Sequence, residues 1–149
     1  MIFQKFSTTA IKKIPASSPA PTYETARVVK VTDGDSIELS TGENIRYIGI
    51  NSPELESNEC FAAESAKANS DLVLGKTVSL VRDISETDKY GRSLYYVYVG
   101  DIFVNDYLLK NGFAKVMTVP PDVKFEDEFV SSEAYAKANA LGLWGKCSN

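Results

Sequence analysis

Short runs of β-branched and apolar residues dominate the first half of the chain. Three of them cover residues 26–32, 36–40 and 44–50, and an Asp-Gly and a Thr-Gly dipeptide separate them. Alternating apolar and polar positions are typical of strands that bury one face, and a glycine-containing dipeptide between two such runs favours a tight turn. We therefore expect three consecutive antiparallel strands.

A helical pattern follows. Small and apolar residues recur three or four positions apart in residues 61–74, and Gly75 comes next, where a residue in the left-handed conformation commonly ends a helix. This stripe consists of Ala62, Ala66, Asn69 and Val73. We expect one helix across residues 61–74.

The second half of the chain repeats both patterns. Residues 77–82 and 93–99 form two strand-like runs, and helical stripes follow at residues 104–112 and 126–141. The stripes consist of Val104, Tyr107 and Leu108 in the first and of Phe129, Val130, Ala134 and Leu141 in the second. Three strands, a helix and a hairpin fit a small Greek-key barrel of the OB type, whose open face commonly binds oligonucleotides. The predicted fold class is α+β, mainly β: a five-stranded OB-type barrel with three helices.

The start of the chain has no periodic pattern. Residues 15–21 are Pro, Ser and Ala only, a composition typical of a flexible, partly extended linker. No signal-peptide core occurs here, so the sequence leaves open both a chain that follows a removed export signal and a cytosolic chain. We expect a linker at residues 1–23, one domain at residues 24–149 and no membrane span.

Composition narrows the chemistry. The 149 residues include no histidine, which excludes hydrolases that depend on an imidazole base. Carboxylates, cations or a metal ion remain as catalysts. The formal net charge of -4 opposes nucleic-acid binding, which normally depends on clustered Lys and Arg. A local cationic cleft or a bound metal ion would reconcile the charge with that function.

Oxygen-bearing side chains gather at one end of the first three strands. If a two-residue turn joins the second and third strands, Asp35 faces Ile48 and Asn51 lies near Asp35. The oxygen donors at this end are then Asp33, Asp35, Asn51, the Ser52 carbonyl and Glu54. Such hard donors suit Ca2+. An Asp-Gly turn and a solvated Glu explain any one of these residues taken alone.

Two arginines are candidates for anion binding. Arg46 shares a strand face with Ile48 and Ile50, where a cation needs a partner. It either snorkels at the strand end or points into a site that holds an anion. Arg92 follows Gly91 at the start of a strand, where an ordinary exposed charge is the simpler interpretation.

Three motifs follow one another along the chain: Val-Thr-Asp-Gly-Asp-Ser at residues 31–36, Ile-Arg-Tyr-Ile-Gly-Ile-Asn-Ser-Pro-Glu at residues 45–54 and Thr-Asp-Lys-Tyr-Gly-Arg at residues 87–92. Together they resemble the staphylococcal nuclease (thermonuclease) family in order and spacing. The resemblance starts at Ala26 and continues to Leu143-Trp144. Three separate motifs in one order are far more specific than any single motif.

The resemblance implies a Ca2+-dependent nuclease that hydrolyses phosphodiester bonds in DNA or RNA. By this resemblance Asp35, Asn51 and the Ser52 carbonyl bind Ca2+, and Glu54 positions or deprotonates the attacking water. By the same resemblance, Arg46 and Arg92 bind the phosphate and stabilise the charge of the five-coordinate transition state. Lys89 and Tyr90 contact a terminal phosphate or a neighbouring nucleotide. We expect a monomer.

Three departures from the family pattern affect the site. Asn51 stands where the family usually has an aspartate, although its amide oxygen remains a possible ligand. Residues 117–120 lack the tyrosines that contact the nucleotide in the family prototype, which weakens the case for base stacking. The segment between Glu54 and Phe61 is shorter, which leaves the preference between DNA and RNA open.

Cys60 and Cys147 are the only cysteines. Exported nuclease-like relatives have a similar Glu-Cys-Phe segment and Trp-Gly-x-Cys ending, so the resemblance implies a disulfide and a secreted or cell-envelope protein. Two unpaired cysteines in a cytosolic domain remain the alternative.

Two other functions compete with a nuclease. An OB-type module that binds nucleic acid or protein without catalysis agrees with the acidic balance and with Asn51. A calcium-stabilised structural domain accounts for Asp35 and Glu54 but gives no reason for Arg46.

Overall fold

The computed structural model describes residues 23–148. The expected linker therefore lies outside the described residues except for Tyr23, and the first strand begins at Glu24. Within residues 23–148, no helix combines the length and the apolar character that crossing a bilayer requires.

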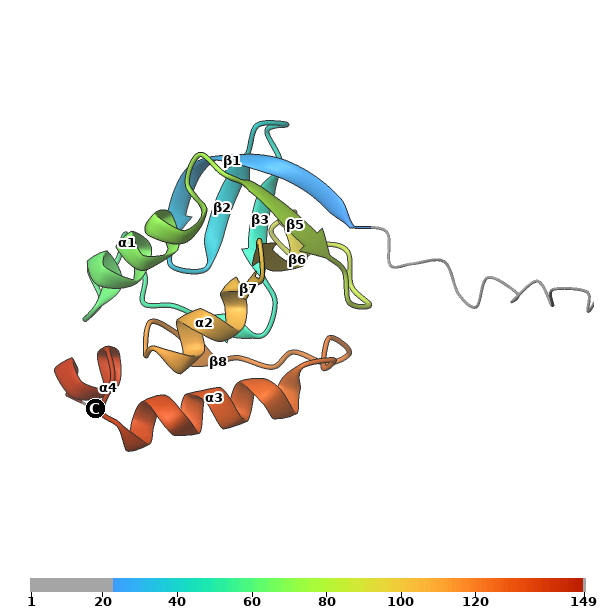
Figure 1. The fold of residues 1–149 in the computed structure, drawn as a ribbon. Coiled ribbons are helices and arrows are strands. Elements are labelled where there is room, and N and C mark those ends of the chain that lie inside the picture. Colours follow the sequence, from blue (N-terminus) through green and yellow to red (C-terminus); the bar gives the residue numbers. More distant parts are fainter. Residues whose placement is uncertain (1–22, 149) are drawn as a thin grey trace, which may run out of the picture.

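Five strands close into a mixed barrel (Figure 1). β1 (Glu24–Asp33), β2 (Ser36–Leu39) and β3 (Asn44–Tyr47) form the expected antiparallel meander, and β5 (Thr77–Val81) and β6 (Ser93–Val99) continue the sheet from β1. A parallel pairing between β3 and β6 closes the barrel, and β7 (Ile102–Phe103) extends the β6 edge. The predicted OB-type barrel is confirmed.

The alternating apolar residues of the strands fill the barrel. Ile37 and Leu39 of β2 are each 1% exposed, and Ile45 of β3 is fully buried. The same core includes Val28, Tyr47, Val78, Leu80, Tyr95 and Val97. Burying a large apolar side chain contributes roughly 1.5–3 kcal/mol, so this core holds the strand ends that carry the site.

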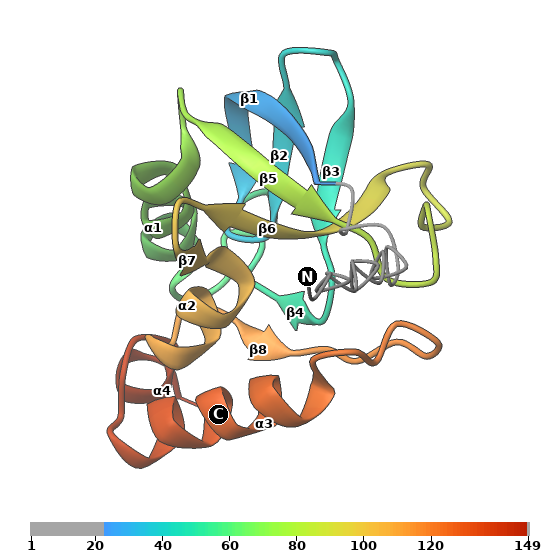
Figure 2. The same cartoon turned by 45° about the vertical axis from the view of Figure 1, so that its right-hand side comes forward.

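The three expected helices are present, and a single-turn helix follows them. They are α1 (Ala62–Val73), α2 (Val104–Lys110), α3 (Glu126–Ala138) and the short α4 (Leu143–Lys146). Between the barrel and α3, β4 (Ile50–Asn51) pairs with β8 (Lys115–Val116), as Figure 2 shows.

All three helical stripes differ from those expected. In α2, Tyr107 is 40% exposed, and Asn105 and Leu109 are buried with Val104 and Leu108. Ser65, not Ala66, belongs to the buried face of α1. α3 ends at Ala138, and Val130 is 52% exposed. The buried residues of α3 are Phe129, Ser132 and Ala136, a narrow stripe with one large side chain. Sequence spacing overestimated the apolar face, because only these three residues of α3 are buried.

The predicted pairing of β2 with β3 is wrong by one residue. Ser36 pairs with Arg46, and the Asp35 carbonyl accepts the Tyr47 N–H at 2.9 Å, so Asp35 does not face Ile48. The hairpin loop has three residues because Gly42 adopts a left-handed φ of 87°. A turn followed by a left-handed residue is the common three-residue hairpin, and it shifts the register relative to a two-residue turn.

The expected strand across residues 44–50 is broken. β3 ends at Tyr47, and β4 begins at Ile50 in a different sheet. Gly49 lies between them with φ 82°, and a Cβ there would be 2.6 Å from the Phe129 ring. Because of this break the chain leaves the barrel and pairs with β8. Asn51 then lies within hydrogen-bond distance of Arg46, near the end of β3.

Candidate functional site

Asp35 lies in the turn between β1 and β2 and is 5% exposed. One carboxylate oxygen accepts the Ser36 hydroxyl at 2.8 Å, and the other accepts the Ser52 N–H at 2.8 Å. The second oxygen also lies 3.3 Å from the Arg46 guanidinium. The carboxylate is therefore fixed in direction by two parts of the chain.

Arg46 is buried at the end of β3, with 8% of the residue exposed. One guanidinium nitrogen donates to the carbonyls of Tyr47 and Ile50, each at 2.8 Å. The other lies 3.3 Å from Asp35 and donates to the Asn51 amide oxygen at 3.3 Å. Burial lowers the pKa of Arg46 and the charge of Asp35 opposes this shift. Arg46 does not snorkel; it is a buried cation that links Asp35 to Asn51.

Asn51 and Ser52 complete this cluster. Ser52 is 2% exposed, and its hydroxyl oxygen is buried with no hydrogen-bond partner among the described residues. The structure thus brings Asp35, Arg46, Asn51 and Ser52 together, although the register used to predict their approach was wrong.

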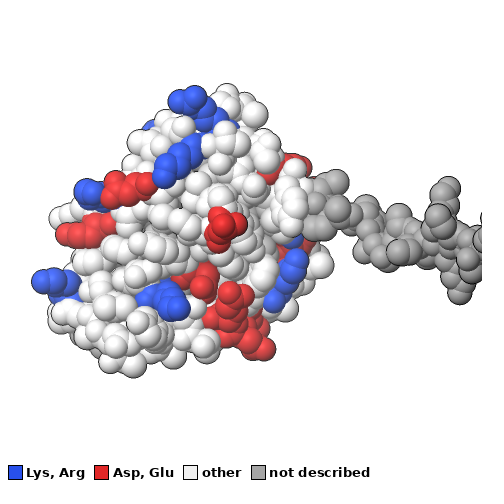
Figure 3. Space-filling view, viewed as in Figure 1, with Lys and Arg blue, Asp and Glu red and all other residues white. Residues whose placement is uncertain are grey.

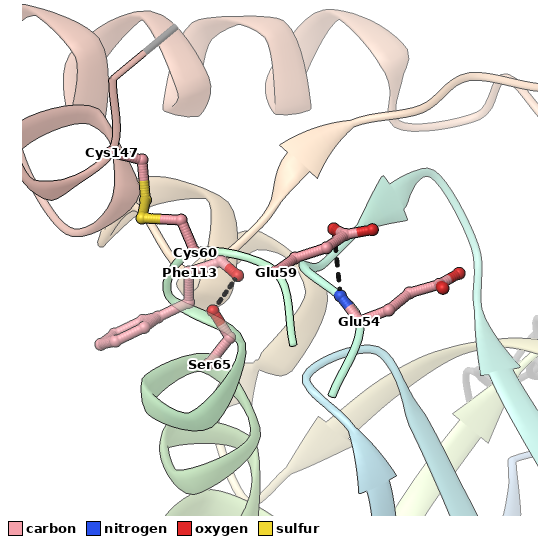
Figure 4. Close-up of a disulfide and its surroundings, with 6 residues drawn as sticks. All are labelled: Glu54, Glu59, Cys60, Ser65, Phe113 and Cys147. Atoms are coloured by element: carbon pink, nitrogen blue, oxygen red, sulfur yellow. Dashed lines mark hydrogen bonds between the residues drawn. A yellow bond between two sulfur atoms is a disulfide. The ribbon is translucent and has the colours of Figure 1, made fainter. Parts of the chain in front are cut away.

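Glu54 lies on an exposed loop that leads to α1. Its carboxylate accepts the Ser57 hydroxyl at 3.2 Å, and its N–H donates to Glu59 at 3.2 Å. Figure 4 shows Glu54 and Glu59 extending in the same direction, away from the disulfide. The next residue, Leu55, donates its N–H to Asp33 at 3.0 Å, which ties this loop to the end of β1.

A disulfide holds the far end of the same loop. Cys60 and Cys147 are joined, with their Cα atoms 5.9 Å apart (Figure 4). Nearby, the Ser65 hydroxyl of α1 donates to the Phe113 carbonyl at 2.7 Å. The predicted pairing is therefore present, and it connects the Glu54 loop to the C-terminal segment.

Arg92 lies at the base of the connection between β5 and β6. Its Nε donates to Asp88 at 2.7 Å, and the other Asp88 oxygen accepts the N–H groups of Tyr90 and Arg92, each at 2.9 Å. Burial alone would raise the pKa of Asp88, but these hydrogen bonds outweigh it and lower that pKa. Arg92 is thus held by a local turn, and its guanidinium lies 5.4 Å from the Tyr90 ring centre.

A pocket of about 470 Å³ brings the two arginines to one space. Arg46 and Arg92 line it together with Lys89 and Tyr90. Met117, Val119 and Pro120 also line the pocket. Aliphatic groups therefore occupy the positions at which the sequence lacks the nucleotide-contacting tyrosines of the family. Asn51 and Ser52 line a separate, smaller cavity of about 220 Å³, and Glu54 lines neither.

The cationic charge is local. Lysines, arginines and acidic residues alternate over the face seen in Figure 3, which shows no broad basic patch. Arg46, Arg92 and Lys89 are the cationic residues that line the pocket, and they form a local group of positive charge there.

The oxygen donors near Arg46 are of the kind that a hard cation prefers. Within residues 23–148, no three acidic or cysteine side chains form a metal-binding group by themselves, so a site would combine Asp35 with the Asn51 amide and the Ser52 carbonyl. Burial, and then the charges of Asp35 and Glu54, raise the pKa of Asp33, although its hydrogen bond from Leu55 opposes this. This crowding of negative charge beside oxygen donors favours a divalent cation.

Two buried asparagines hold the backbone around the site in place. Neither was predicted from the sequence to do so. Asn69 of α1 donates to the Asp33 carbonyl at 2.9 Å and accepts the Tyr47 hydroxyl at 2.7 Å. Asn105 of α2 accepts the Val97 N–H and donates to the Ile48 carbonyl, each at 2.9 Å. An asparagine within an apolar helical stripe was the available signal in both cases.

Comparisons with known proteins identify a family. The family model described as "Staphylococcal nuclease homologue" matches residues 44–146. The chain is 31% identical over 128 residues to the "Thermonuclease" of Staphylococcus intermedius, covering 81% of this chain and 76% of that protein.

Two proteins of Bacillus subtilis strain 168 are also similar. "SPbeta prophage-derived endonuclease YokF" is 36% identical over 126 residues, and "Endonuclease YncB" is 35% identical over 126 residues, each over 78% of this chain. The chain spans only 43% and 60% of the lengths of these two relatives. With a family model that matches more than half of its residues, the chain belongs to the staphylococcal nuclease family.

Proposed function

We propose that this chain is a Ca2+-dependent nuclease that hydrolyses phosphodiester bonds in DNA, RNA or both. The observation that carries the proposal is the position of Arg46, which contacts the oxygen donors Asp35 and Asn51 and also lines the pocket shared with Arg92. The names of the staphylococcal and Bacillus relatives, thermonuclease and endonuclease, support the same activity.

The residues divide the chemistry between them. Asp35, Asn51 and the Ser52 carbonyl would hold Ca2+, which would supply positive charge beside the phosphodiester. Arg46 and Arg92 bind non-bridging oxygens of the phosphate and stabilise the charge that grows in the transition state.

Glu54 positions or deprotonates the attacking water. Its carboxylate is exposed, and the Ser57 hydroxyl fixes its direction. An exposed carboxylate is accessible to water, as a general base requires.

Lys89 and Tyr90 contact the nucleotide next to the cleaved bond. Both are exposed at the rim of the pocket, and the Lys89 ammonium lies 5.1 Å from the Tyr90 ring centre. A cation beside an aromatic face offers charge to a phosphate and a flat surface to a base.

Digestion assays test the proposal. Plasmid DNA, single-stranded DNA and RNA are incubated with the protein in Ca2+ and, separately, in a chelator. We expect cleavage in Ca2+ only, and Glu54→Gln and Arg92→Ala each reduce turnover by roughly a hundredfold or more. Glu56→Gln and Arg27→Ala are the matched controls, because they change the same charges at exposed positions away from the pocket. Absence of cleavage of every substrate by a folded, Ca2+-binding protein would falsify the proposal.

A catalytically inactive binding module is the second candidate. It is favoured by one observation, that Glu54 lines neither cavity at the site. Binding of oligonucleotides without cleavage in Ca2+ would identify this function.

We propose an extracytoplasmic location, secreted or in the cell envelope, and a monomer. The disulfide supports that location, because such bonds persist in oxidising compartments. Fractionation of the producing cell and light scattering of the purified protein test these two statements.

A further inference from the structure

Two loops from distant parts of the sequence form the walls of the arginine pocket. One connects β5 to β6 and carries Lys89, Tyr90 and Arg92; the other connects β8 to α3 and carries Met117 and Val119. No strand pairing joins these two loops in the described part of the chain. Something else must therefore set the distance between the walls.

Each loop provides one carboxylate that accepts hydrogen bonds from backbone N–H groups of the other loop. Asp122, on the second loop, accepts the N–H groups of Ile84 and Ser85 at 3.0 and 2.7 Å. Asp83, on the first loop, accepts the Lys124 N–H at 3.1 Å. We call this pair of reciprocal contacts the carboxylate clamp.

Both ends of the carboxylate clamp rest on ordered structure. Tyr96 of β6 is 1% exposed, and its hydroxyl donates to Asp83 at 2.6 Å. Its ring lies 4.7 Å from that of Phe125, centre to centre. Asp122 is 6% exposed, and its own N–H donates to the Val119 carbonyl at 3.0 Å. The clamp thus connects the pocket wall to the aromatic core beneath it.

The groups at the pocket rim depend on this support. The first loop has its own internal contacts, such as Asp88 with Arg92, which fix the shape of the tip but not its distance from Val119. Hydrogen bonds to charged acceptors are stronger than those between neutral groups, so the three contacts of the clamp favour one separation of the loops.

We propose that Asp83 and Asp122 are positioning residues that hold the pocket at the width needed to bind a nucleotide of the substrate, without taking part in the chemical step. The proposal rests on the proposed nuclease function for its substrate, but the contacts between the loops are independent of it. Loss of the clamp lets the loops separate, so substrate binding weakens while the arrangement of Asp35, Arg46 and Asn51 is unchanged.

Kinetics of three variants test the proposal. Asp122→Ala and Asp83→Ala remove an acceptor, whereas Asp122→Asn keeps an oxygen that accepts the same N–H groups. Cleavage of a labelled oligonucleotide in Ca2+ should show KM raised about tenfold in the alanine variants, with kcat within about twofold of wild type. Asp122→Asn should have a KM close to that of the wild type. Glu86→Ala is the control, because it removes an exposed acid from the same loop.

Two further measurements do not need catalysis. Hydrogen exchange at the amides of Ile84, Ser85 and Lys124 should accelerate in the alanine variants and not in Glu86→Ala. A fluorescent phosphorothioate oligonucleotide should bind about tenfold more weakly by anisotropy. Both readouts remain valid if wild type proves inactive, so failure of the nuclease proposal is distinguishable from failure of the clamp.

Other results overturn the proposal. A folded Asp122→Ala protein with unchanged KM and unchanged amide hydrogen exchange refutes the proposal. A fall in kcat at constant KM assigns these residues to chemistry instead. If Asp122→Ala does not fold, Tyr96→Phe, which removes only the hydroxyl that holds Asp83, must show the same rise in KM, and an unchanged KM refutes the idea.

Discussion

Removal of the Cys60–Cys147 disulfide offers a direct measure of how the chain is held together. The perturbation is the double change Cys60→Ser and Cys147→Ser, which exchanges sulfur for oxygen at two positions and leaves the rest of the sequence unchanged. The cysteines are 87 residues apart, so the bond restrains more than half of the unfolded chain.

The size of the effect follows from that separation. In the chain-entropy description, closing a loop of 87 residues lowers the conformational entropy of the unfolded state and stabilises the fold by about 4–5 kcal/mol. Ordinary domains have a free energy of unfolding of about 5–15 kcal/mol. The double variant should therefore remain folded at room temperature but lose a large part of its stability.

Urea denaturation at equilibrium gives the magnitude. Oxidised wild type, reduced wild type and the double serine variant are compared, and the last two should coincide. Reductant added to the serine variant is the control, and it should have no effect. A difference below about 1 kcal/mol between oxidised and reduced wild type would contradict the entropic reasoning.

Three further changes have defined outcomes. Asn51→Asp should tighten Ca2+ binding by calorimetry, because a carboxylate adds charge to the proposed ligands, and should lower the metal-free melting temperature slightly through repulsion from nearby acids. Burial, followed by a hydrogen bond to Glu24, raises the pKa of Tyr95 from 10.0 to about 12. Since the folded state keeps this proton longer than the unfolded state, stability should fall as pH rises from 10 to about 12, and Tyr95→Phe should flatten that fall in thermal melts. Gly49→Ala should cost about 3 kcal/mol in urea denaturation, because the new Cβ meets the Phe129 ring at a positive φ.

The barrel was predictable because its strands follow simple alternation. Ile37, Leu39 and Ile45 occupy alternate positions and are all buried, as that pattern indicates. The hairpin register was not predictable from the same pattern, because it depends on whether Gly42 adopts a left-handed conformation. A local backbone choice at one residue therefore changed every pairing along β2 and β3.

The site was predictable only in part. The motifs identified Asp35, Arg46 and Asn51 as one group, and the structure places them in contact, while their roles in binding and catalysis stay predictions. The carboxylate clamp gave no signal, because Asp83 and Asp122 are far apart in the sequence and each resembles an ordinary loop acid. Contacts of this kind depend on tertiary folding and not on local spacing.

The arginine pocket can form during folding only when β3 pairs with β6, because Arg46 lies on β3 and Arg92 directly precedes β6. Arg46 pairs with Leu94, two positions after Arg92, and this pairing joins segments separated by the whole of α1 and β5. Contacts between such distant segments have a high loop-closure entropy cost, which makes pairings of this kind slow to form. During synthesis, a nascent chain that has not yet released β6 from the ribosome can form the meander but has no second arginine beside the first. The approach of Arg92 to Arg46 and the closure of the barrel thus depend on the same strand pairing.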